Sequence, residues 1–309
     1  MKLQDLMMLY GVTLGARHTK RQRYLFATQM KEALTEHGWD YEVQTNPKGK
    51  TARRVENIVV GDPSRAKTVF VAPYDTPTKA TRPFHYYPFN PEKTMGEERR
   101  DMTVKTVLGL LVAVLSVPLI TLAIQRGGTW LLLLAPAALF LVLGYRTMRG
   151  QANEVNFNRA SAAVAVCMKL VEALKDKKNS VSFVFCDQAA TSYEGYRVLG
   201  MELSQTANVV VLDAIAYGET LVLAHGPLAN LRARKLLEKL PEGTRERTYG
   251  EEQLERNLLS FFPGGMVLTS GKIEGGELLV ENTHSSGDHK LDLPRLEQIE
   301  KALEDFVRD

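Results

Sequence analysis

The chain has 309 residues, a formal net charge of +3 at pH 7 and 24% charged residues. A net charge so close to zero gives no electrostatic basis for binding nucleic acid, so we expect no nucleic-acid partner. Its two cysteines, Cys167 and Cys186, lie in apolar stretches without metal-type spacing and are expected to be reduced core residues.

Patterns typical of strands and helices alternate along the chain. Short apolar runs, which are typical of buried strands, are separated by stretches with helical periodicity. This alternation predicts an α/β domain with a mostly parallel central sheet flanked by helices. The expected strands are residues 41–44, 56–60, 68–71, 181–186, 208–212, 220–224, 266–269 and 277–281. The expected helices are residues 21–37, 159–175, 193–204, 228–240, 250–259 and 294–307.

Two long apolar segments interrupt this alternation. Residues 104–124 carry one lysine at their edge as their only charge, and residues 129–145 carry none. At about 1.5 Å per residue, helices of these lengths would span roughly 31 Å and 25 Å, close to the thickness of the hydrocarbon core of a bilayer. Residues 125–128 leave room only for a tight turn, so the two helices would form a hairpin with both ends on one side.

The hairpin divides the α/β domain into two parts. The predicted organisation is a first part at residues 1–100, a transmembrane helical hairpin at 101–149 and a second part at 150–309. Pro118 and Pro136, near the middle of each segment, would also permit a re-entrant hairpin instead of two full crossings. Two buried helices of a soluble core are a further alternative, which is disfavoured because both segments are apolar all round.

Charged and aromatic residues around these segments predict an orientation. Basic residues gather at the domain ends, whereas Arg126 stands alone in the turn. The positive-inside rule therefore predicts a multi-pass membrane protein with its globular domain and both termini in the cytoplasm. Residues 1–14 agree, because they lack the apolar run and cleavage site of a signal peptide. The expected membrane-flanking residues are Arg99, Arg100, Lys105, Trp130, Tyr145, Arg146 and Arg149.

Basic residues also cluster near the N-terminus. In a tethered domain such a cluster would attract anionic lipid, and a merely solvated surface is the alternative. The cluster consists of Arg17, His18, Lys20, Arg21 and Arg23, with an extension of Lys48, Lys50, Arg53 and Arg54.

Polar steps follow several of the expected strands. They are Pro73-Tyr74-Asp75-Thr76, Asn158-Arg159-Ala160-Ser161, Asp187-Gln188-Ala189-Ala190, Asp213-Ala214-Ile215, and Thr283-His284 with Asp288. In this order, the steps resemble the signatures of the M28 family of zinc-dependent exopeptidases, which have an aminopeptidase-like fold. The resemblance covers nearly the whole chain and implies the same α/β fold.

The resemblance also implies that most zinc ligands are absent. Pro73 stands where the family has a histidine ligand, and Asn158 stands where it has the aspartate that bridges two zinc ions. Ala189 and Ala190 replace the glutamate that acts as general base and the glutamate that binds zinc. Without a carboxylate at position 189, no group stands ready to activate a water molecule.

Three polar residues of the signatures survive. Asp213 and His284 match metal ligands of the family, whereas Asp75 matches a residue that acts through the missing histidine. Because a catalytic zinc needs about three protein ligands and an open position, we expect no cofactor, with zinc as the alternative. Asp75 and Asp213 could then simply cap helices or satisfy buried amides. The expected degenerate pocket consists of Pro73, Asp75, Asn158, Ala189, Ala190, Asp213 and His284.

The preferred reading is therefore a catalytically inactive M28-like membrane protein that acts as a scaffold or binding subunit of a membrane complex. Nicalin and nicastrin look like the same fold used in this way. The lipid bilayer is one expected partner, and a membrane protein that contacts the hairpin or the globular domain is another. Small residues that would permit close helix approach are Gly109, Ala113, Ser116, Ala135, Ala137 and Ala138.

Two alternatives assign a function to the cleft that corresponds to the active site of the M28 family. One is an active membrane-bound metallo-aminopeptidase with a rewired zinc site that recruits Asp187, Glu194, His85 or His289. The other is a pocket without metal that still binds a ligand such as a peptide terminus.

Overall fold

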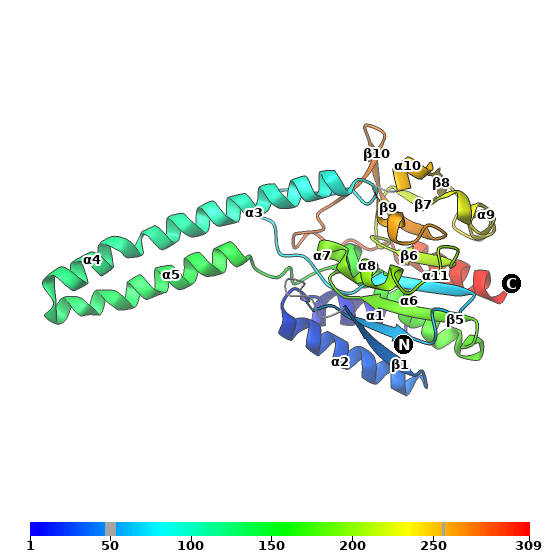
Figure 1. The fold of residues 1–309 in the computed structure, drawn as a ribbon, viewed down its shortest axis with the longest axis horizontal. Coiled ribbons are helices and arrows are strands. Elements are labelled where there is room, and N and C mark those ends of the chain that lie inside the picture. Colours follow the sequence, from blue (N-terminus) through cyan, green and yellow to red (C-terminus); the bar gives the residue numbers. More distant parts are fainter. Residues whose placement is uncertain (47–53, 255–256) are drawn as a thin grey trace.

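The computed structural model describes residues 1–46, 54–254 and 257–309. It shows an α/β body from which a long helical hairpin projects (Figure 1). Lys48, Lys50 and Arg53 of the basic cluster lie outside the described residues, as does part of the expected helix 250–259.

Within the described residues, the strands form one ten-stranded sheet in the order β1-β2-β5-β3-β6-β9-β10-β4, and β7 pairs with both β9 and β8. The central neighbours β5, β3, β6 and β9 run parallel. The outer pairs β1–β2, β2–β5, β9–β10 and β10–β4 run antiparallel. The bounds are β1 Tyr41–Thr45, β2 Glu56–Val60, β3 Thr68–Pro73, β4 His85–Tyr86, β5 Val181–Cys186, β6 Val209–Leu212, β7 Thr220–His225, β8 Arg245–Thr248, β9 Met266–Glu274 and β10 Glu277–Glu281.

The expected fold class is confirmed, with the difference that the sheet is mixed. Gly275 and Gly276 join β9 to β10, and both have positive φ, which a tight hairpin turn requires. Such a turn makes consecutive strands antiparallel, whereas the alternation of strands and helices predicts parallel ones. The short strands β4 and β8 are absent from the sequence-based prediction, because neither has an apolar run long enough to indicate a strand.

Helices cover both faces of the sheet. Their bounds in the body are α1 Leu3–Met8, α2 Lys20–Glu36, α6 Ala162–Ala173, α7 Ala189–Ser192, α8 Glu194–Gly200, α9 Asn230–Leu237, α10 Glu251–Leu254 and α11 Leu293–Arg308. The π-helical turns Leu9–Thr13 and Phe157–Ser161 continue α1 and precede α6. The short 3-10 helices are Lys175–Lys177, Pro227–Ala229 and Leu258–Phe261.

Strand β3 shows how the two halves of the core are built. Phe70 and Ala72 pack on the face covered by α1, α2, α6, α9 and α11, whereas Val69 and Val71 pack on the face covered by α8. Successive side chains of a strand point to opposite faces, so a strand covered on both faces is apolar throughout. Both Cys167 and Cys186 are buried and free, which confirms the expectation for the cysteines.

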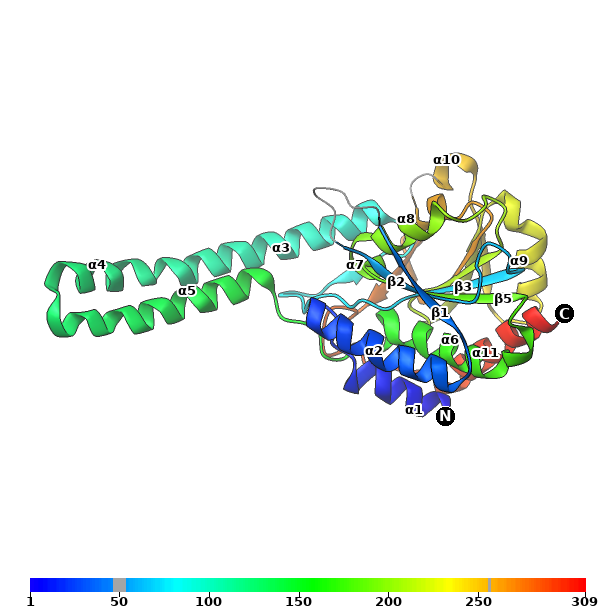
Figure 2. The same cartoon turned by 60° about the horizontal axis from the view of Figure 1, so that its bottom comes forward.

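The hairpin consists of α3 (Pro91–Val114), α4 (Ser116–Arg126), a 3-10 turn (Gly128–Leu133) and α5 (Leu134–Arg149). The stretches Pro91–Arg126 and Gly128–Arg149 are long and apolar enough to cross a membrane, with mean hydropathies of 2.7 and 1.9. Only 17% and 11% of their most apolar parts are buried. Neither is therefore a core helix of the body (Figure 2).

Helices α3 and α5 approach each other at Gly109 and Gly144. A Cβ atom added at Gly109 would lie 2.6 Å from the carbonyl oxygen of Gly144, and one added at Gly144 would lie 2.6 Å from that of Gly109. Only glycine fits such a crossing. Ala113 lies 3.1 Å from the same Gly144 position. Gly109 and Ala113, which the sequence assigned to a partner contact, are thus used within the hairpin.

The first turns of α3 lie against the body before the helix leaves it. Lys105 forms a buried ion pair with Asp101 at 2.5 Å and donates to the hydroxyl of Thr78 at 2.9 Å. Asp101 accepts from the backbone N–H of Thr81 at 2.7 Å. The body thus offers the ammonium group of Lys105 a carboxylate and a hydroxyl at the domain end of the hairpin, where this residue was expected to flank the membrane.

Candidate functional site

The polar steps of the sequence meet at one edge of the sheet. Asp75 follows β3, Asp187 follows β5, and Asp213 follows β6, and these three neighbouring parallel strands end on the same side. Parallel strands bring their carboxyl ends to one edge, where α/β proteins commonly place their sites. The sequence-predicted pocket residues are therefore gathered in one region.

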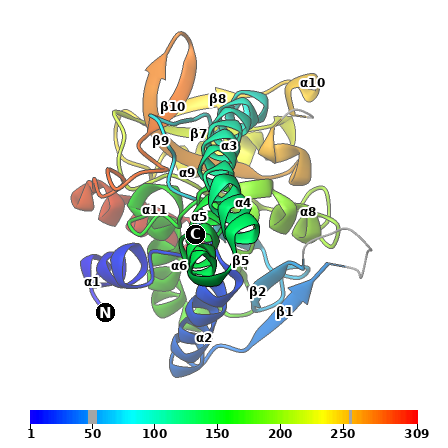
Figure 3. The same cartoon turned by 90° about the vertical axis from the view of Figure 1, so that its left-hand side faces the viewer.

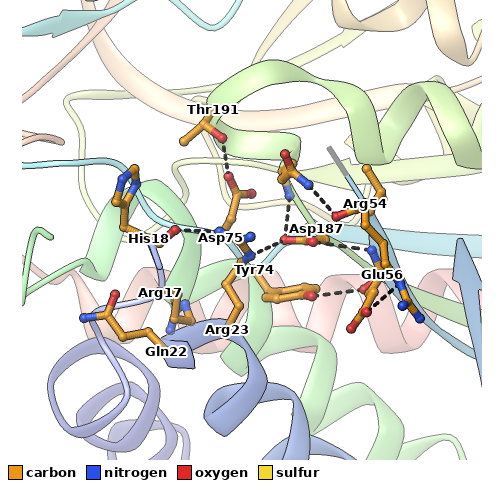
Figure 4. Close-up of polar contacts among 12 residues, drawn as sticks. Arg17, His18, Gln22, Arg23, Arg54, Glu56, Tyr74, Asp75, Asp187 and Thr191 are labelled. Atoms are coloured by element: carbon orange, nitrogen blue, oxygen red, sulfur yellow. Dashed lines mark hydrogen bonds and ion pairs between the residues drawn. The ribbon is translucent and has the colours of Figure 1, made fainter. Parts of the chain in front are cut away.

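Asp75 holds the short helix α7 in place. Its Oδ1 accepts from the backbone N–H groups of Ala189 and Ala190, each at 2.8 Å, and its Oδ2 accepts from the hydroxyl of Thr191 at 2.8 Å (Figure 4). The first N–H groups of a helix have no partner inside the helix, and a carboxylate satisfies them well. Both oxygens of Asp75 are thus used, and Ala189 and Ala190 take part through their backbone alone. Pro73, two residues earlier, is the last residue of β3 and is buried.

Asn158 connects the turn before α6 with the loop after β6. Its Oδ1 accepts from the backbone N–H of Ala216 at 2.9 Å, and its Nδ2 donates to the carbonyl oxygen of Tyr217 at 2.8 Å. The backbone N–H of Asn158 donates to Oδ1 of Asp288 at 2.8 Å. An aspartate could not make the bond to the carbonyl of Tyr217, so the amide is chemically suited to this place.

Arg159 lies at the centre of the region. Its Nη1 donates to Oδ1 of Asp213 at 2.5 Å, and its Nη2 donates to the carbonyl oxygen of Ala190 at 2.7 Å. The guanidinium carbon lies 3.7 Å from the ring centre of Tyr86, whose hydroxyl donates to Oδ2 of Asp213. Arg159 and Asp213 are 2% and 1% exposed. An internal cation therefore occupies the space between Asp213 and the backbone of Ala190.

The charge of this arginine is balanced locally. Burial opposes the charge on Arg159, but Asp213 together with Tyr86, Tyr193 and Tyr196 outweighs that effect and raises the pKa of Arg159 well above its usual value. Burial also raises the pKa of Tyr86 well above its usual range, so its hydroxyl keeps the proton that it donates to Asp213. Asp213, Arg159 and Tyr86 thus form a buried, charge-compensated cluster.

His284 is neutral and packed. Its ring stacks on Phe84, with 3.6 Å between ring centres, and its Nδ1 lies 3.0 Å from the hydroxyl of Thr283. Burial, followed by the nearby charge of Arg159, lowers the pKa of His284 well below its usual value. A neutral imidazole could in principle bind a metal ion, but the cations that act on it here are those of Arg159 and Lys105.

Zinc does not fit the residues present. Both oxygens of Asp213 and both oxygens of Asp75 accept hydrogen bonds, and the amide oxygen of Asn158 accepts from the backbone. Among the residues that the structure describes, no group of three or more His, Cys, Asp or Glu side chains could hold a metal ion. Since a catalytic zinc needs about three such ligands, the family's metal chemistry has no support in this region.

The residues proposed for a rewired metal site are engaged elsewhere. Asp187 forms an ion pair with Arg23 at 2.9 Å (Figure 4), and Glu194 forms one with Arg197 at 2.8 Å. His85 pairs with β10 from the short strand β4, and Nδ1 of His289 lies 2.9 Å from the carbonyl oxygen of Ser286. Among the residues that the structure describes, none of the four joins Asp213 and His284 in a group of three or more possible ligands.

The backbone around the region is strained. Among the described residues, the non-glycine residues with positive φ are Gln188, Tyr193, Ala214 and Asn282. Gln188 and Tyr193 flank α7, Ala214 follows Asp213, and Asn282 lies two residues before His284. Each such conformation costs on the order of 1 kcal/mol and is tolerated where the surroundings fix the chain. The surrounding structure therefore holds an unusual backbone geometry at this edge.

Sequence reasoning missed Arg159 and Tyr86. Both belong to segments that the sequence analysis used or described, but neither matches a ligand position. In the sequence, only the position of Arg159 pointed to this role: it follows Asn158, where the resemblance implies a metal ligand, and it precedes an apolar helix. Such a charge needs a buried partner, and the surviving Asp213 was available.

Comparisons with known proteins give a fold. No protein-family model matches the chain, and no curated protein matches its sequence. The structure is similar to a Bacteroides thetaiotaomicron glutaminyl cyclase bound to N-acetylhistamine, with 11% identity, a TM-score of 0.57 and coverage of 99% of this chain and 95% of that one. The chain has the zinc-exopeptidase fold.

Two further structures support this conclusion. A leucine aminopeptidase precursor from Bacteroides thetaiotaomicron has 12% identity, a TM-score of 0.53 and coverage of 99% and 94%. A Zn-dependent exopeptidase from Parabacteroides distasonis has 9% identity, a TM-score of 0.55 and the same coverage. At these identities the likeness concerns the fold, which agrees with the fold that the M28 resemblance implied.

Proposed function

We propose that this protein is a membrane-anchored, catalytically inactive relative of the zinc exopeptidases that acts as a scaffold or binding subunit of a membrane complex. The observation that carries the proposal is the buried ion pair between Arg159 and Asp213. The guanidinium supplies, from the chain itself, the positive charge that a metal ion would otherwise bring to Asp213.

Electrostatics favours the arginine over a metal at this position. A divalent cation next to a buried guanidinium would meet like charge in a region of low dielectric constant, where such repulsion is strong. Arg159 would have to leave Asp213 and Ala190, and its charge would lose its buried partner. Positions 189 and 190, after β5, carry no carboxylate that could bind the metal ion and so compensate for the lost ion pair.

The hairpin supports anchoring in a bilayer. Its outer surface carries exposed aliphatic side chains such as Leu111, Ile124 and Leu132, which are 60%, 72% and 77% exposed. Exposed apolar surface of this extent needs lipid or another protein to cover it. We propose that the hairpin spans the membrane and that the body lies in the cytoplasm, because the exposed basic residues Arg99 and Arg146 flank the domain side.

Metal content and turnover test the inactive state. We expect the protein, purified in mild detergent, to contain no stoichiometric zinc. We also expect no turnover of aminoacyl, dipeptide or N-terminal glutaminyl substrates after addition of zinc, cobalt or manganese. The matched variant restores the residues that the M28 resemblance implies, with Pro73→His, Asn158→Asp, Arg159→Asn, Ala189→Glu and Ala190→Glu, and it should gain bound zinc. Stoichiometric metal in the wild type, with turnover abolished by His284→Ala, would favour the active aminopeptidase instead.

Membrane attachment and assembly need separate tests. We expect the chain to stay with membranes after a carbonate wash, and its release into the supernatant would contradict anchoring. For the scaffold role, we expect a stable companion to co-purify from native membranes and to be identified by mass spectrometry. A chain that is always recovered as an isolated monomer would contradict the scaffold role while leaving the anchoring intact.

A further inference from the structure

The basic cluster near the N-terminus divides into an inner and an outer part. Arg17 is fully buried and donates to the hydroxyl of Ser161 at 2.8 Å. Arg23 pairs with the buried carboxylate of Asp187 (Figure 4). These two arginines stabilise the fold and are not available to a partner. Lys20 and Arg21, at the start of α2, are exposed.

The start of α2 lies at the base of the hairpin. Segments 11–19, 77–82 and 150–157 interlock there. The backbone N–H of Lys79 donates to the carbonyl oxygen of Gln151 at 2.8 Å, and the amide of Asn156 donates to the carbonyl oxygen of Gly15 at 2.8 Å. Figure 3 looks along the hairpin onto this face of the body. A body anchored through the hairpin turns this face toward the bilayer.

Exposed cations lie in these interlocked segments and in the helix ends close to them in the chain. We call them the basal cations: Lys20, Arg21, Lys79 and Arg146. Each is exposed, and none has an ion-pair partner among the residues that the structure describes. Glu154 is an exposed acidic residue on the same interlocked segments, so the face carries a net positive charge.

Two of these cations stand where the local structure disfavours them. The N-terminal end of a helix carries partial positive charge, and cations in the first turn cost a few tenths of a kcal/mol or more. Helix α2 begins Lys20-Arg21-Gln22-Arg23 and has no acidic residue in its first turn. Lys20 and Arg21 therefore do not stabilise helix α2, and the stability of the fold does not account for their presence. A local rule broken without an internal gain points to a role outside the fold.

We infer that the basal cations bind the anionic headgroups of phospholipids in the bilayer that the hairpin enters. The inference rests on the proposed membrane insertion. Each Lys or Arg close to an anionic membrane surface contributes about 1 kcal/mol, and the attraction falls off within about a Debye length. Four cations fixed beside the hairpin therefore select anionic over zwitterionic lipid.

The test uses the full chain, reconstituted into vesicles that mix phosphatidylcholine with phosphatidylglycerol. After mild extraction, native mass spectrometry counts the lipids of each class that stay bound. We expect phosphatidylglycerol to be enriched over its share in the vesicle at low salt, and less so at high salt. The basal variant, with Lys20→Gln, Arg21→Gln, Lys79→Gln and Arg146→Gln, should lose at least about half of this enrichment.

The matched control removes equal charge from the far end of the body. It carries Lys67→Gln, Lys175→Gln, Arg234→Gln and Lys235→Gln, at exposed positions near a cavity of about 500 Å³ that lies away from the hairpin. This variant should keep the enrichment. Equal loss in both variants, or full enrichment in the basal variant, would overturn the inference. Circular dichroism of both variants checks that they fold.

Two further measurements distinguish lipid binding from binding of free phosphate and from a failure of membrane insertion. Inorganic phosphate added to the mixed vesicles should reduce the phosphatidylglycerol enrichment no more than sodium chloride does at equal ionic strength. A larger reduction that the basal variant abolishes would identify free phosphate as the ligand instead. Resistance to carbonate extraction is measured on the same samples. If extraction releases the chain, the proposed insertion has failed. If the chain stays inserted but shows no enrichment, the lipid inference alone has failed.

Discussion

The guanidinium of Arg159 lies 2.5 Å from the carboxylate of Asp213, and both side chains are almost completely buried. In the resemblance to zinc exopeptidases, Asp213 is a surviving metal ligand. Here it is the counterion of an arginine that also binds the backbone of Ala190. Both charged groups of this edge are therefore paired with each other inside the protein.

The ion pair should be important for stability. Arg159→Met removes the charge and leaves the carboxylate of Asp213 buried with one hydroxyl partner, so we expect a loss of about 3–5 kcal/mol. Thermal or denaturant unfolding in mild detergent measures it. The double variant Arg159→Met/Asp213→Leu should recover most of the loss. Arg197→Met, at an exposed ion pair, is the control and should cost less than about 1 kcal/mol. Equal effects of both arginine variants would contradict the role of Arg159.

Asp75 should act as a structural cap. Asp75→Ala leaves the N–H groups of Ala189 and Ala190 and the hydroxyl of Thr191 without their acceptor, so we expect a loss of about 2–3 kcal/mol. Asp75→Asn keeps one oxygen in place and should lose about half as much. Denaturant unfolding of the two variants measures the difference. If Asp75→Asn loses as much stability as Asp75→Ala, the charge of Asp75, and not only its acceptor oxygen, is needed.

Stability should depend on pH through His284. Burial lowers the pKa of its imidazole, so the folded protein binds this proton less readily than the unfolded chain. The contribution is therefore complete above the unfolded pKa of about 6.5 and is lost as pH falls below it, at up to about 1.4 kcal/mol per pH unit. Unfolding measured from pH 7.5 to pH 5 should show a weaker decline in His284→Phe. His289→Gln, at an exposed position, should leave the decline unchanged.

The crossing of the hairpin helices should tolerate no side chain. Gly109→Val places atoms within 2.6 Å of the carbonyl of Gly144, so we expect the helices to separate at a cost of about 1–3 kcal/mol. Gly96 lies in the same helix with open space around its Cβ position, and Gly96→Ala should be neutral or stabilise by about 0.5–1 kcal/mol. Disulfide trapping between cysteines introduced on α3 and α5 measures the separation. Equal trapping in both variants would contradict the packing described here.

The sequence predicted the fold wherever burial leaves a continuous apolar run. Strands β2, β5 and β10 begin and end at the predicted residues, because polar or turn residues bound each run. It could not predict the short strands β4 and β8, since their pairing depends on neighbours distant in the sequence. The mixed direction of the sheet has the same origin: it follows from the Gly275-Gly276 turn and from pairings between distant strands.

The candidate site was predicted in part. The positions of Asp75 and Asp213 at strand ends followed from the order of the polar steps, and these positions also allowed a capping role for Asp75. The partner of Asp213 could not be predicted, because the direction of the Arg159 side chain is set by the packing of α6 against the sheet. The pairing of Lys105 with Asp101 could not be predicted for a similar reason, because both are residue types that are usually exposed.

The chain enters and leaves the hairpin at neighbouring points, since the ammonium group of Lys105 lies 3.3 Å from where Gly150 would carry a Cβ atom. For the α/β body, the whole insertion therefore amounts to one long excursion between adjacent ends. The entropy lost on closing such an excursion grows only with the logarithm of its length. A helical hairpin of this kind can thus be added to this architecture, or removed from it, with little change to the rest of the molecule.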